Sequence, residues 1–251
     1  MVQVLCDIAR RATQTPPTPG RDRDEAFSAQ QNARLVRNAE TYYRTMFQAG
    51  VSSWNLRDSH MMETLVALDQ HLAGADAGAA AGPPPRIAVW AHNSHLGDAS
   101  ATEMGERGEW NVGQLVRDRH GDDAVLVGFS THHGRVTAAS NWDEPPRRKR
   151  VRDGLPGSWE DVFHHTGVPR FLLPLRDDGA LRELVAPRRL QRAIGVIYRP
   201  DTERQSHYFH TRLAEQFDAV VHFDETRALE PLDVGAGWHD QEAPETYPTG
   251  I

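Results

Sequence analysis

Apolar positions in the first third of the chain recur at helical spacing in two long segments. These segments cover about residues 24–49 and 53–73. Residues 13–20 carry three prolines, and residues 74–85 are rich in Ala, Gly and Pro without an apolar period, so neither stretch extends a helix. The pattern therefore predicts an αα hairpin between two loops.

After this hairpin, short apolar runs alternate with helical segments. We expect strands at residues 87–91, 124–129, 135–139, 170–175, 193–198 and 219–223, and helices at 111–120, 158–167 and 203–217. Such alternation predicts the α/β class, and a hairpin at Gly134 predicts a mixed sheet. We divide the chain into an N-terminal segment and linker (1–20), an α/β domain (21–233) and a poorly ordered tail (234–251).

Composition narrows the class of protein. The 251 residues carry a net charge of −7, which disfavours a nucleic-acid binder, and the basic run Arg147–Arg152 is interpreted as a solvated loop. A single cysteine, Cys6, excludes an intramolecular disulfide framework and a cysteine-based zinc cluster. The N-terminus lacks a signal-peptide pattern, and no apolar run reaches the roughly 18 residues of a membrane helix. We expect a cytoplasmic protein without membrane or nucleic-acid partners.

The stretch Trp90–Asp98 combines the expected end of a strand with two histidines, His92 and His95. Functional groups of open α/β sheets gather past the carboxyl ends of strands. Either imidazole could act as a general acid or base, or stabilise an oxyanion. Alternatively, they cap the following helix or bind backbone carbonyls, or they ligate zinc together with a third histidine or a carboxylate such as Asp98. Gly97 is interpreted as permitting a tight turn.

Two further polar clusters are candidates for the same site. Arg57 and His60 lie at the entry of the second predicted helix, where Arg57 could clamp a carboxylate or serve a structural role. Arg199 and His207 follow another expected strand, where they could bind substrate oxygens or anchor a helix. The run Thr131–Gly134 is interpreted as a hairpin tip. A Gly-x-Ser-x-Gly elbow and a phosphate-binding loop are both absent from the sequence, which disfavours a serine triad.

Several of these motifs occur together in one known family. The relevant segments are Asn32–Arg34, Asn38–Arg44, Trp54–Met61, Trp90–Asp98, Asn111–Leu115, Tyr198–Pro200 and Ser206–Phe209. In them the chain resembles the erythromycin esterase family, from about Phe27 to Leu232. The resemblance implies a three-layer α/β/α fold with a mostly parallel, mixed sheet and a helical hairpin insertion. It also implies hydrolysis of a small-molecule ester or lactone by an activated water, without a metal or cofactor.

The resemblance also implies roles for individual residues. His92 matches an active-site position and His95 lies beside it, so both are expected to be catalytic, with Arg57 supporting them. Four residues are expected to contact the substrate: His60, Asn93, Arg199 and His207.

One departure from the family pattern affects this expectation. Family members carry an N-terminal half with a Gly-Glu-x-x-His-like motif that supplies the general base, and this sequence starts after that region. We therefore expect a C-terminal portion whose exposed core surface is covered by a second copy or another partner. The alternatives are a domain that binds a ligand or partner without catalysis, and a metal-dependent hydrolase.

Overall fold

The computed structural model describes residues 21–46, 51–75 and 85–231. These residues form two compact units. The helical unit contains the described residues up to 91 together with 104–124, and the sheet unit contains 92–103 together with 125–231. None of the described helices is long and apolar enough to cross a membrane.

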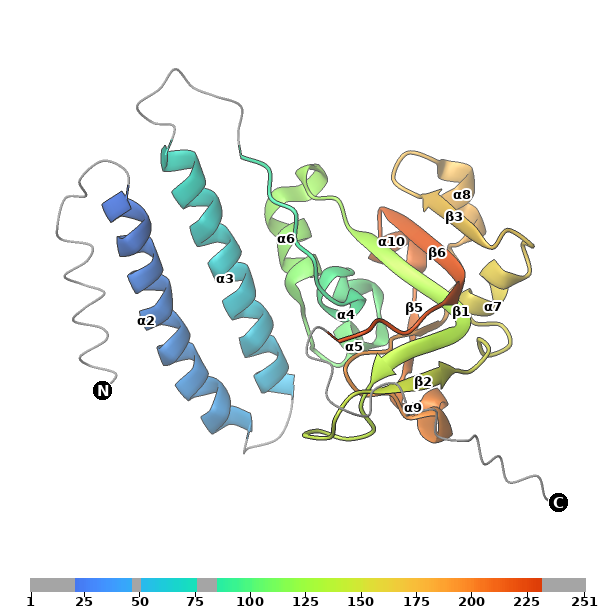
Figure 1. Ribbon diagram of the computed structural model, residues 1–251. Helices are drawn as coiled ribbons and strands as arrows, with labels where there is room; N and C mark the ends of the chain where they lie inside the picture. The colour runs from blue at the N-terminus through green and yellow to red at the C-terminus, as the bar shows by residue number, and fades with distance from the viewer. Residues whose placement is uncertain (1–20, 47–50, 76–84, 232–251) are drawn as a thin grey trace. The chain divides into compact units, whose positions relative to one another are not determined.

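The helical unit consists mainly of two long helices and a shorter one. Helices α2 (Arg21–Met46) and α3 (Val51–Ala75) lie side by side (Figure 1), which confirms the predicted αα hairpin. Asn38 Nδ2 lies 2.8 Å from His60 Nδ1 and so links the two helices. The short α5 (Glu103–Glu106) precedes α6 (Val112–His120), which begins at the N-cap Asn111 and packs on α3. The first turn of α6 is tied to α3 because Val112 N donates to Asp58 Oδ1 at 3.2 Å.

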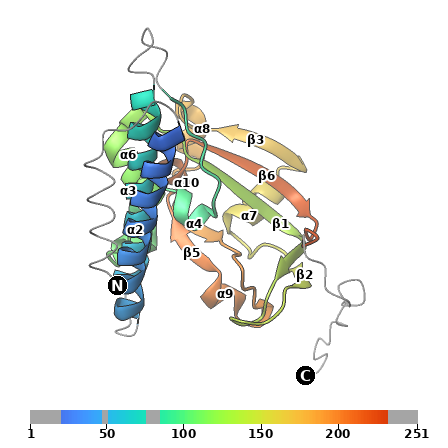
Figure 2. The ribbon, with the colours of Figure 1, turned by 60° about the vertical axis from the view of Figure 1, so that its left-hand side comes forward.

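The sheet unit contains a four-stranded sheet in the order β2-β1-β6-β3 (Figure 2). Its strands are β1 (Val127–Ala138), β2 (Arg147–Val151), β3 (Arg170–Pro174) and β6 (Ala219–Thr226). The pair β1 and β6 is parallel, whereas β1 with β2 and β3 with β6 are antiparallel. The mixed α/β fold is confirmed, although antiparallel pairs outnumber parallel ones in the described residues, the reverse of the mostly parallel sheet that was predicted.

A second, two-stranded sheet and several short helices complete this unit. Strands β4 (Arg189–Arg192) and β5 (Tyr208–Thr211) pair antiparallel. The short helices are α4 (Asn93–Leu96), η1 (Ala99–Ala101), α7 (Trp159–His164), α8 (Gly179–Leu184), η3 (Pro200–Thr202), α9 (Glu203–Ser206) and α10 (Leu213–Gln216), and η2 (Gly121–Asp123) follows α6 in the helical unit.

The main core of the sheet unit lies on one face of the four-stranded sheet. It joins Trp159 and Phe163 of α7 to Leu213, Phe217 and Val220, all of them buried. The opposite face of the sheet exposes large apolar side chains: Phe129 on β1, Leu172 on β3 and Phe223 on β6.

The position of the Phe217 ring explains why residues 97 and 128 are both glycine. A Cβ on Gly97 would lie 2.7 Å from this ring, and a Cβ on Gly128 would lie 2.8 Å from it. The chain turns at this point, since Gly97 N donates to Asn93 O at 2.8 Å, but Gly97 has φ −78° and ψ 152°, which any residue can adopt. The position is restricted by the space that Phe217 occupies rather than by backbone conformation.

The predicted strand at residues 87–91 is also wrong. The structure describes no strand there, and Val89 and Trp90 are 46% and 87% exposed. Apolar character reveals a preference for burial, but a strand also needs a partner for its backbone N–H and C=O groups. Within the described residues no strand supplies that partner.

Other differences follow from the same dependence on partners. The predicted hairpin at Gly134 is absent because β1 continues through it to Ala138, and the basic run 147–151 is a strand rather than a solvated loop. The expected helix at 203–217 is broken into α9, β5 and α10. The expected strand at 193–198 is wrong: strand β4 ends at Arg192, and the segment contains an isolated bridge between Ile197 and Ala139. The predicted segments 1–20 and 234–251 lie outside the described residues.

Candidate active site

His92 stands directly before α4, and both of its ring nitrogens have partners within the sheet unit. Nδ1 accepts from the backbone N–H of Ser94 at 3.2 Å, which makes His92 the N-cap of α4, and it lies 2.8 Å from Ser94 Oγ. Nε2 lies 2.8 Å from the carbonyl oxygen of Ile194. Because Nδ1 accepts from a backbone N–H and a carbonyl only accepts, the ring proton is placed on Nε2.

The environment of His92 favours a neutral ring. Burial lowers the pKa of His92, the charge of nearby His95 lowers it further, and the hydrogen bond to Ile194 opposes the shift. A neutral imidazole with a fixed tautomer can donate from Nε2 to a developing negative charge. The capping and carbonyl-binding role that was one alternative for this histidine is therefore present in the structure, and it also defines the chemistry that the ring can perform.

Asn93 fastens the start of α4 to the edge of β1. Its Oδ1 accepts from Phe129 N at 3.1 Å, and its Nδ2 donates to Phe129 O at 2.6 Å. The amide thus bonds the main chain of Phe129 as a neighbouring strand would. His95 follows in the same turn, and its backbone N–H donates to His92 O at 2.9 Å.

Arg199 and His207 are brought to the same part of the sheet unit as His92. His207 Nε2 accepts from Arg199 N at 3.0 Å, and its Nδ1 lies 3.2 Å from Ala193 O. His92 and His207 therefore hold the neighbouring carbonyls of Ala193 and Ile194. Burial lowers the pKa of His207, while its hydrogen bond to Ala193 opposes that shift. The guanidinium of Arg199, an exposed residue, donates to Ser140 O and Asn141 Oδ1 at 2.9 and 2.7 Å.

Arg57 and His60 belong to the helical unit, on α3. The Arg57 guanidinium lies 4.6 Å from the centre of the Trp54 ring, and its Nε lies 3.8 Å from Asp58 Oδ2. His60 contacts Asn38, and burial lowers its pKa, as do Arg34 and Arg37, whereas Glu63 raises it. Within the unit, Arg57 therefore contacts side chains of its own helix, and His60 connects α3 to α2.

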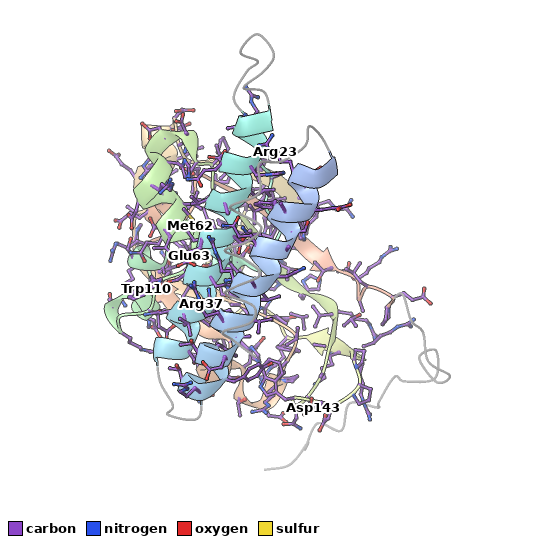
Figure 3. All side chains as sticks on the ribbon, turned by 90° about the vertical axis from the view of Figure 1, so that its left-hand side faces the viewer. Arg23, Arg37, Met62, Glu63, Trp110 and Asp143 are labelled. Atoms are coloured by element: carbon purple, nitrogen blue, oxygen red, sulfur yellow. The ribbon has the colours of Figure 1, made fainter. Side chains whose placement is uncertain are left out.

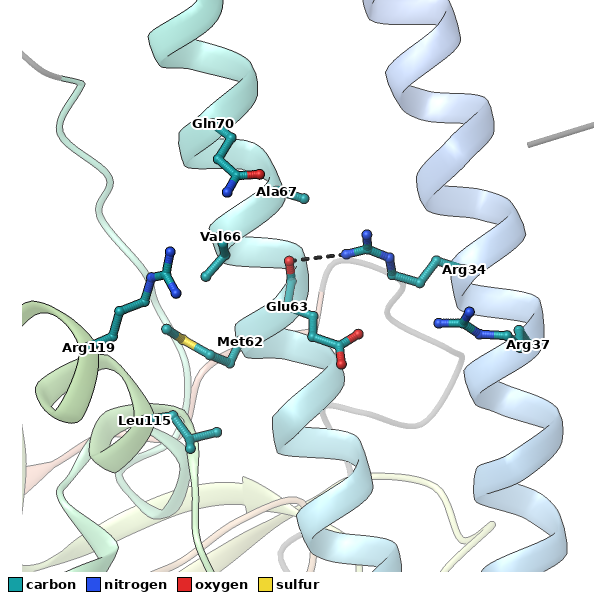
Figure 4. Close-up of a pocket in the computed structure, with 9 residues that line it drawn as sticks. All are labelled: Arg34, Arg37, Met62, Glu63, Val66, Ala67, Gln70, Leu115 and Arg119. Carbon is teal, nitrogen blue, oxygen red and sulfur yellow. Dashed lines mark hydrogen bonds between the residues drawn. The ribbon is translucent and has the colours of Figure 1, made fainter. Parts of the chain in front are cut away.

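The helical unit also contains an open pocket of about 580 Å³ that holds none of the predicted site residues. Its lining comes from α2, α3 and α6 and comprises Arg34, Arg37, Met62, Glu63, Val66, Ala67, Gln70, Leu115 and Arg119 (Figure 4). Arg37 on α2 faces the side of α3 that carries Glu63 (Figure 4). Both residues are labelled in Figure 3, which shows the side chains of the two helices. Arg34 Nη1 donates to Glu63 O at 3.3 Å.

The zinc alternative at the His92 stretch finds no support in the geometry. Asp98 is buried, and its Oδ1 caps η1 by accepting from the N–H of Ser100 at 3.0 Å and from its hydroxyl at 2.6 Å. Among the described residues, the ligand atoms of His92, His95 and Asp98 do not gather into a metal-sized group.

The sheet unit also contains a buried ion pair that sequence reasoning missed. Arg192 Nη1 donates to Glu203 Oε1 at 3.0 Å, and both side chains are almost completely buried. Arg192 Nη2 donates to the carbonyls of Thr131 and His132 at 2.7 and 2.6 Å, and Glu203 also accepts from the Tyr198 hydroxyl at 2.7 Å. A local signal for such a pair is lacking, because its members lie on β4 and α9 and meet only in the folded chain.

Comparisons with known proteins agree with the motifs. The erythromycin esterase family model matches residues 1–226, so the chain belongs to the erythromycin esterase family. Among solved structures, a Bacillus cereus protein is 18% identical with a TM-score of 0.67, over 90% of this chain and 50% of its own, which shows a shared fold.

Two other solved structures are also similar. A succinoglycan biosynthesis protein is 19% identical with a TM-score of 0.49, over 88% of this chain and 53% of its own. A mutant of the erythromycin esterase EreC in its open conformation is 18% identical with a TM-score of 0.41, over 90% of this chain and 58% of its own. The chain therefore spans about half the length of the solved structures that it matches.

Proposed function

We propose that this chain carries the histidine-bearing part of a hydrolase site that cleaves an ester or lactone by attack of water, without a metal or cofactor. The observation that carries the proposal is His92, a half-buried imidazole with a lowered pKa and a fixed tautomer, in a chain that belongs to the erythromycin esterase family. The proposed substrate is a small-molecule ester or lactone.

In this proposal His92 donates from Nε2 to the substrate. Its Nδ1 is already engaged by Ser94, whereas Nε2 binds only a carbonyl that can exchange the ring for another partner. As water adds to the carbonyl carbon, the Nε2–H stabilises the oxyanion by a hydrogen bond, and the proton that the water loses passes to the leaving oxygen as the C–O bond breaks. His95 would support His92 from the same turn, and Arg199 would bind substrate oxygens. Asn93 and His207 would hold the backbone around the site in position, because their side chains form hydrogen bonds to main-chain carbonyls.

The test compares ester hydrolysis by the wild type and by His92→Asn. Asn is a good N-cap, so the variant keeps the start of α4 while losing the imidazole. We expect kcat/KM on a panel of p-nitrophenyl esters and macrolactones to fall by about 10²–10³-fold, the usual contribution of one donor to an oxyanion. His165→Asn is the matched control, since His165 is exposed and bonds only its own helix. Equal activity of His92→Asn and wild type would exclude the proposed role.

A second candidate mechanism rests on one contact, the 2.8 Å between Ser94 Oγ and His92 Nδ1. With Nε2 oriented by Ile194 O, this arrangement resembles a nucleophile, its base and an orienting group. Ser94 Oγ would attack the carbonyl carbon, its proton would pass to Nδ1 and then to the leaving alcohol, and water would release the acyl group.

Ser94→Ala separates the two mechanisms. With water as the nucleophile, Ser94→Ala loses less activity than His92→Asn, and the wild type shows no acyl-enzyme burst. With serine as the nucleophile, Ser94→Ala is as inactive as His92→Asn, and an acyl adduct appears on Ser94 by mass spectrometry. A chain that binds an ester by calorimetry but hydrolyses none of the panel is instead a ligand-binding domain.

A further inference from the structure

Four side chains from three separate elements meet at one place in the sheet unit, and none of the four has a role in the proposed hydrolysis. They are His132 and His133 of β1, His164 of α7 and Asp224 of β6, here called the histidine cluster. One ligand atom from each lies within 4.8 Å of the others. His132 is buried and the other three are partly exposed.

The position of the cluster follows from the parallel pairing of β1 and β6. Their registered pairs run from Val127 with Ala219 to Gly134 with Thr226, and the cluster lies at the carboxyl end of this pairing. Ligands of α/β sheets characteristically bind at the carboxyl ends of parallel strands.

A local distortion of β1 allows two consecutive histidines to point into one volume. Neighbours in a regular strand face opposite sides of the sheet, yet the Nδ1 atoms of His132 and His133 are 3.0 Å apart. Thr131 Oγ1 donates to His133 O at 3.1 Å, and Gly134 follows with φ 119°. A Cβ on Gly134 would lie 2.2 Å from Thr226 O, so glycine is required where β1 bends against β6.

Helix α7 supplies the third histidine from the facing layer. Its N-terminus is fixed by Ser158, whose hydroxyl accepts from Asp161 N at 3.3 Å, and its last residue is His164. His164 Nδ1 lies 2.8 Å from Asp224 Oδ1, and its ring stacks on that of His132 at 3.9 Å between centroids. The cluster therefore spans the α7 layer and the sheet.

Outer groups hold the cluster in place. His222, which is fully buried, has its Nε2 3.6 Å from Asp224 Oδ1 and its Nδ1 3.3 Å from Ser130 Oγ. Arg192 fixes the backbone by donating to His132 O. Such outer contacts orient ligands in metal sites.

We propose that the histidine cluster binds one divalent transition-metal ion of the Zn²⁺ class and that this ion ties α7 to β1 and β6. Three imidazoles and one carboxylate are a donor set that zinc accepts, and four protein ligands make a closed, structural site. Zinc–nitrogen bonds of about 2.0–2.1 Å set neighbouring ligand atoms of a tetrahedron roughly 3.3 Å apart. His132 Nδ1 lies 3.0 Å from His133 Nδ1, and His164 Nδ1 lies 2.8 Å from Asp224 Oδ1, so these pairs are already close to that separation. The stacked rings of His132 and His164 must turn relative to each other before one ion can lie in the plane of both.

The direct test is metal binding by the whole chain. Protein stripped with a chelator and dialysed is titrated with Zn²⁺ by calorimetry, and bound metal is counted by elemental analysis. We expect one tightly bound Zn²⁺ per chain and a higher Tm with Zn²⁺, because a ligand that binds only the native state stabilises it. Mg²⁺, which prefers oxygen ligands in octahedral geometry, should not compete.

Single variants assign the ion to the cluster. His133→Ala and His164→Ala each remove a ligand from a partly exposed position, so the fold without metal should persist. We expect either change to weaken Zn²⁺ binding at least 100-fold, whereas the control His165→Ala, one residue beyond His164 and exposed, should bind like the wild type. Melting curves without metal verify that each variant folds. No Zn²⁺ uptake by the wild type, or equal affinity in His164→Ala and His165→Ala, would overturn the proposal.

Discussion

The His92 stretch and the histidine cluster use the same side chain in opposite ways. At His92, Nδ1 contacts the hydroxyl of Ser94 and Nε2 contacts the carbonyl oxygen of Ile194. In the histidine cluster, ring nitrogens of His132 and His133 face one another, and His164 faces Asp224. The first arrangement fixes a tautomer suited to hydrogen-bond donation, whereas the second brings together four side chains that could share the cation that we propose. The partners of a histidine, rather than its presence, therefore decide which chemistry it can perform.

The substitution of Arg192 should have the largest effect on stability, because Arg192 donates to the backbone carbonyl of His132 in the histidine cluster. Arg192→Ala would leave Glu203 buried without its partner and free the carbonyls of Thr131 and His132. Breaking a buried pair from one side costs about 3–5 kcal/mol, so we expect a loss of that size in the free energy of unfolding, measured by urea denaturation.

Zn²⁺ affinity should weaken along with this stability. The control is Arg204→Ala, at an exposed arginine of α9, which should change stability by no more than about 0.5 kcal/mol. If Arg192→Ala is as stable as Arg204→Ala, the ion pair does not support the cluster.

Gly97 gives a smaller effect and probes the His92 stretch. Gly97→Ala places a Cβ 2.7 Å from the Phe217 ring and 2.9 Å from Gln216 Cγ. Overpacking of this kind costs about 1–3 kcal/mol, and the displaced α4 should lower ester hydrolysis without changing Zn²⁺ binding. Gly179→Ala is the matched control, since a Cβ there meets no atom within 4 Å. Equal stability of the two variants would show that Phe217 can move aside.

Acid gives the smallest expected effect, because it changes proton occupancy without removing a side chain. Burial lowers the pKa of His92 from 6.5, so the folded state binds fewer protons than the unfolded state. The stabilising contribution is complete above pH 6.5 and is lost as the pH falls from there through the folded pKa.

The difference between wild type and His92→Asn isolates this contribution. We expect the unfolding free energy of the wild type to decrease more steeply below pH 6.5 than that of His92→Asn, measured by urea denaturation at several pH values. Parallel curves for the two proteins would mean that His92 titrates alike in both states.

Local patterns in the sequence determined the helices α2, α3, α6 and α7 and the positions of strands β1, β3 and β6. The period of α2 and α3, the N-cap at Asn111 and the capping Ser158 are local features that act within a few residues. The motif around His92 likewise indicated the family, because its residues are contiguous. For these features the sequence suffices, since neighbours in the chain are also neighbours in space.

Tertiary structure alone decided the pairing of strands and the partners of buried polar groups. Residues 87–91 are apolar enough for a strand but have no strand partner among the described residues, and the basic run 147–151 became β2 because β1 pairs with it. The sequence alone predicted a hairpin tip at His132 and His133. In the folded chain, α7 and β6 bring His164 and Asp224 next to them. Contacts between residues 60 or more positions apart depend on the packing of whole elements, which no local pattern encodes.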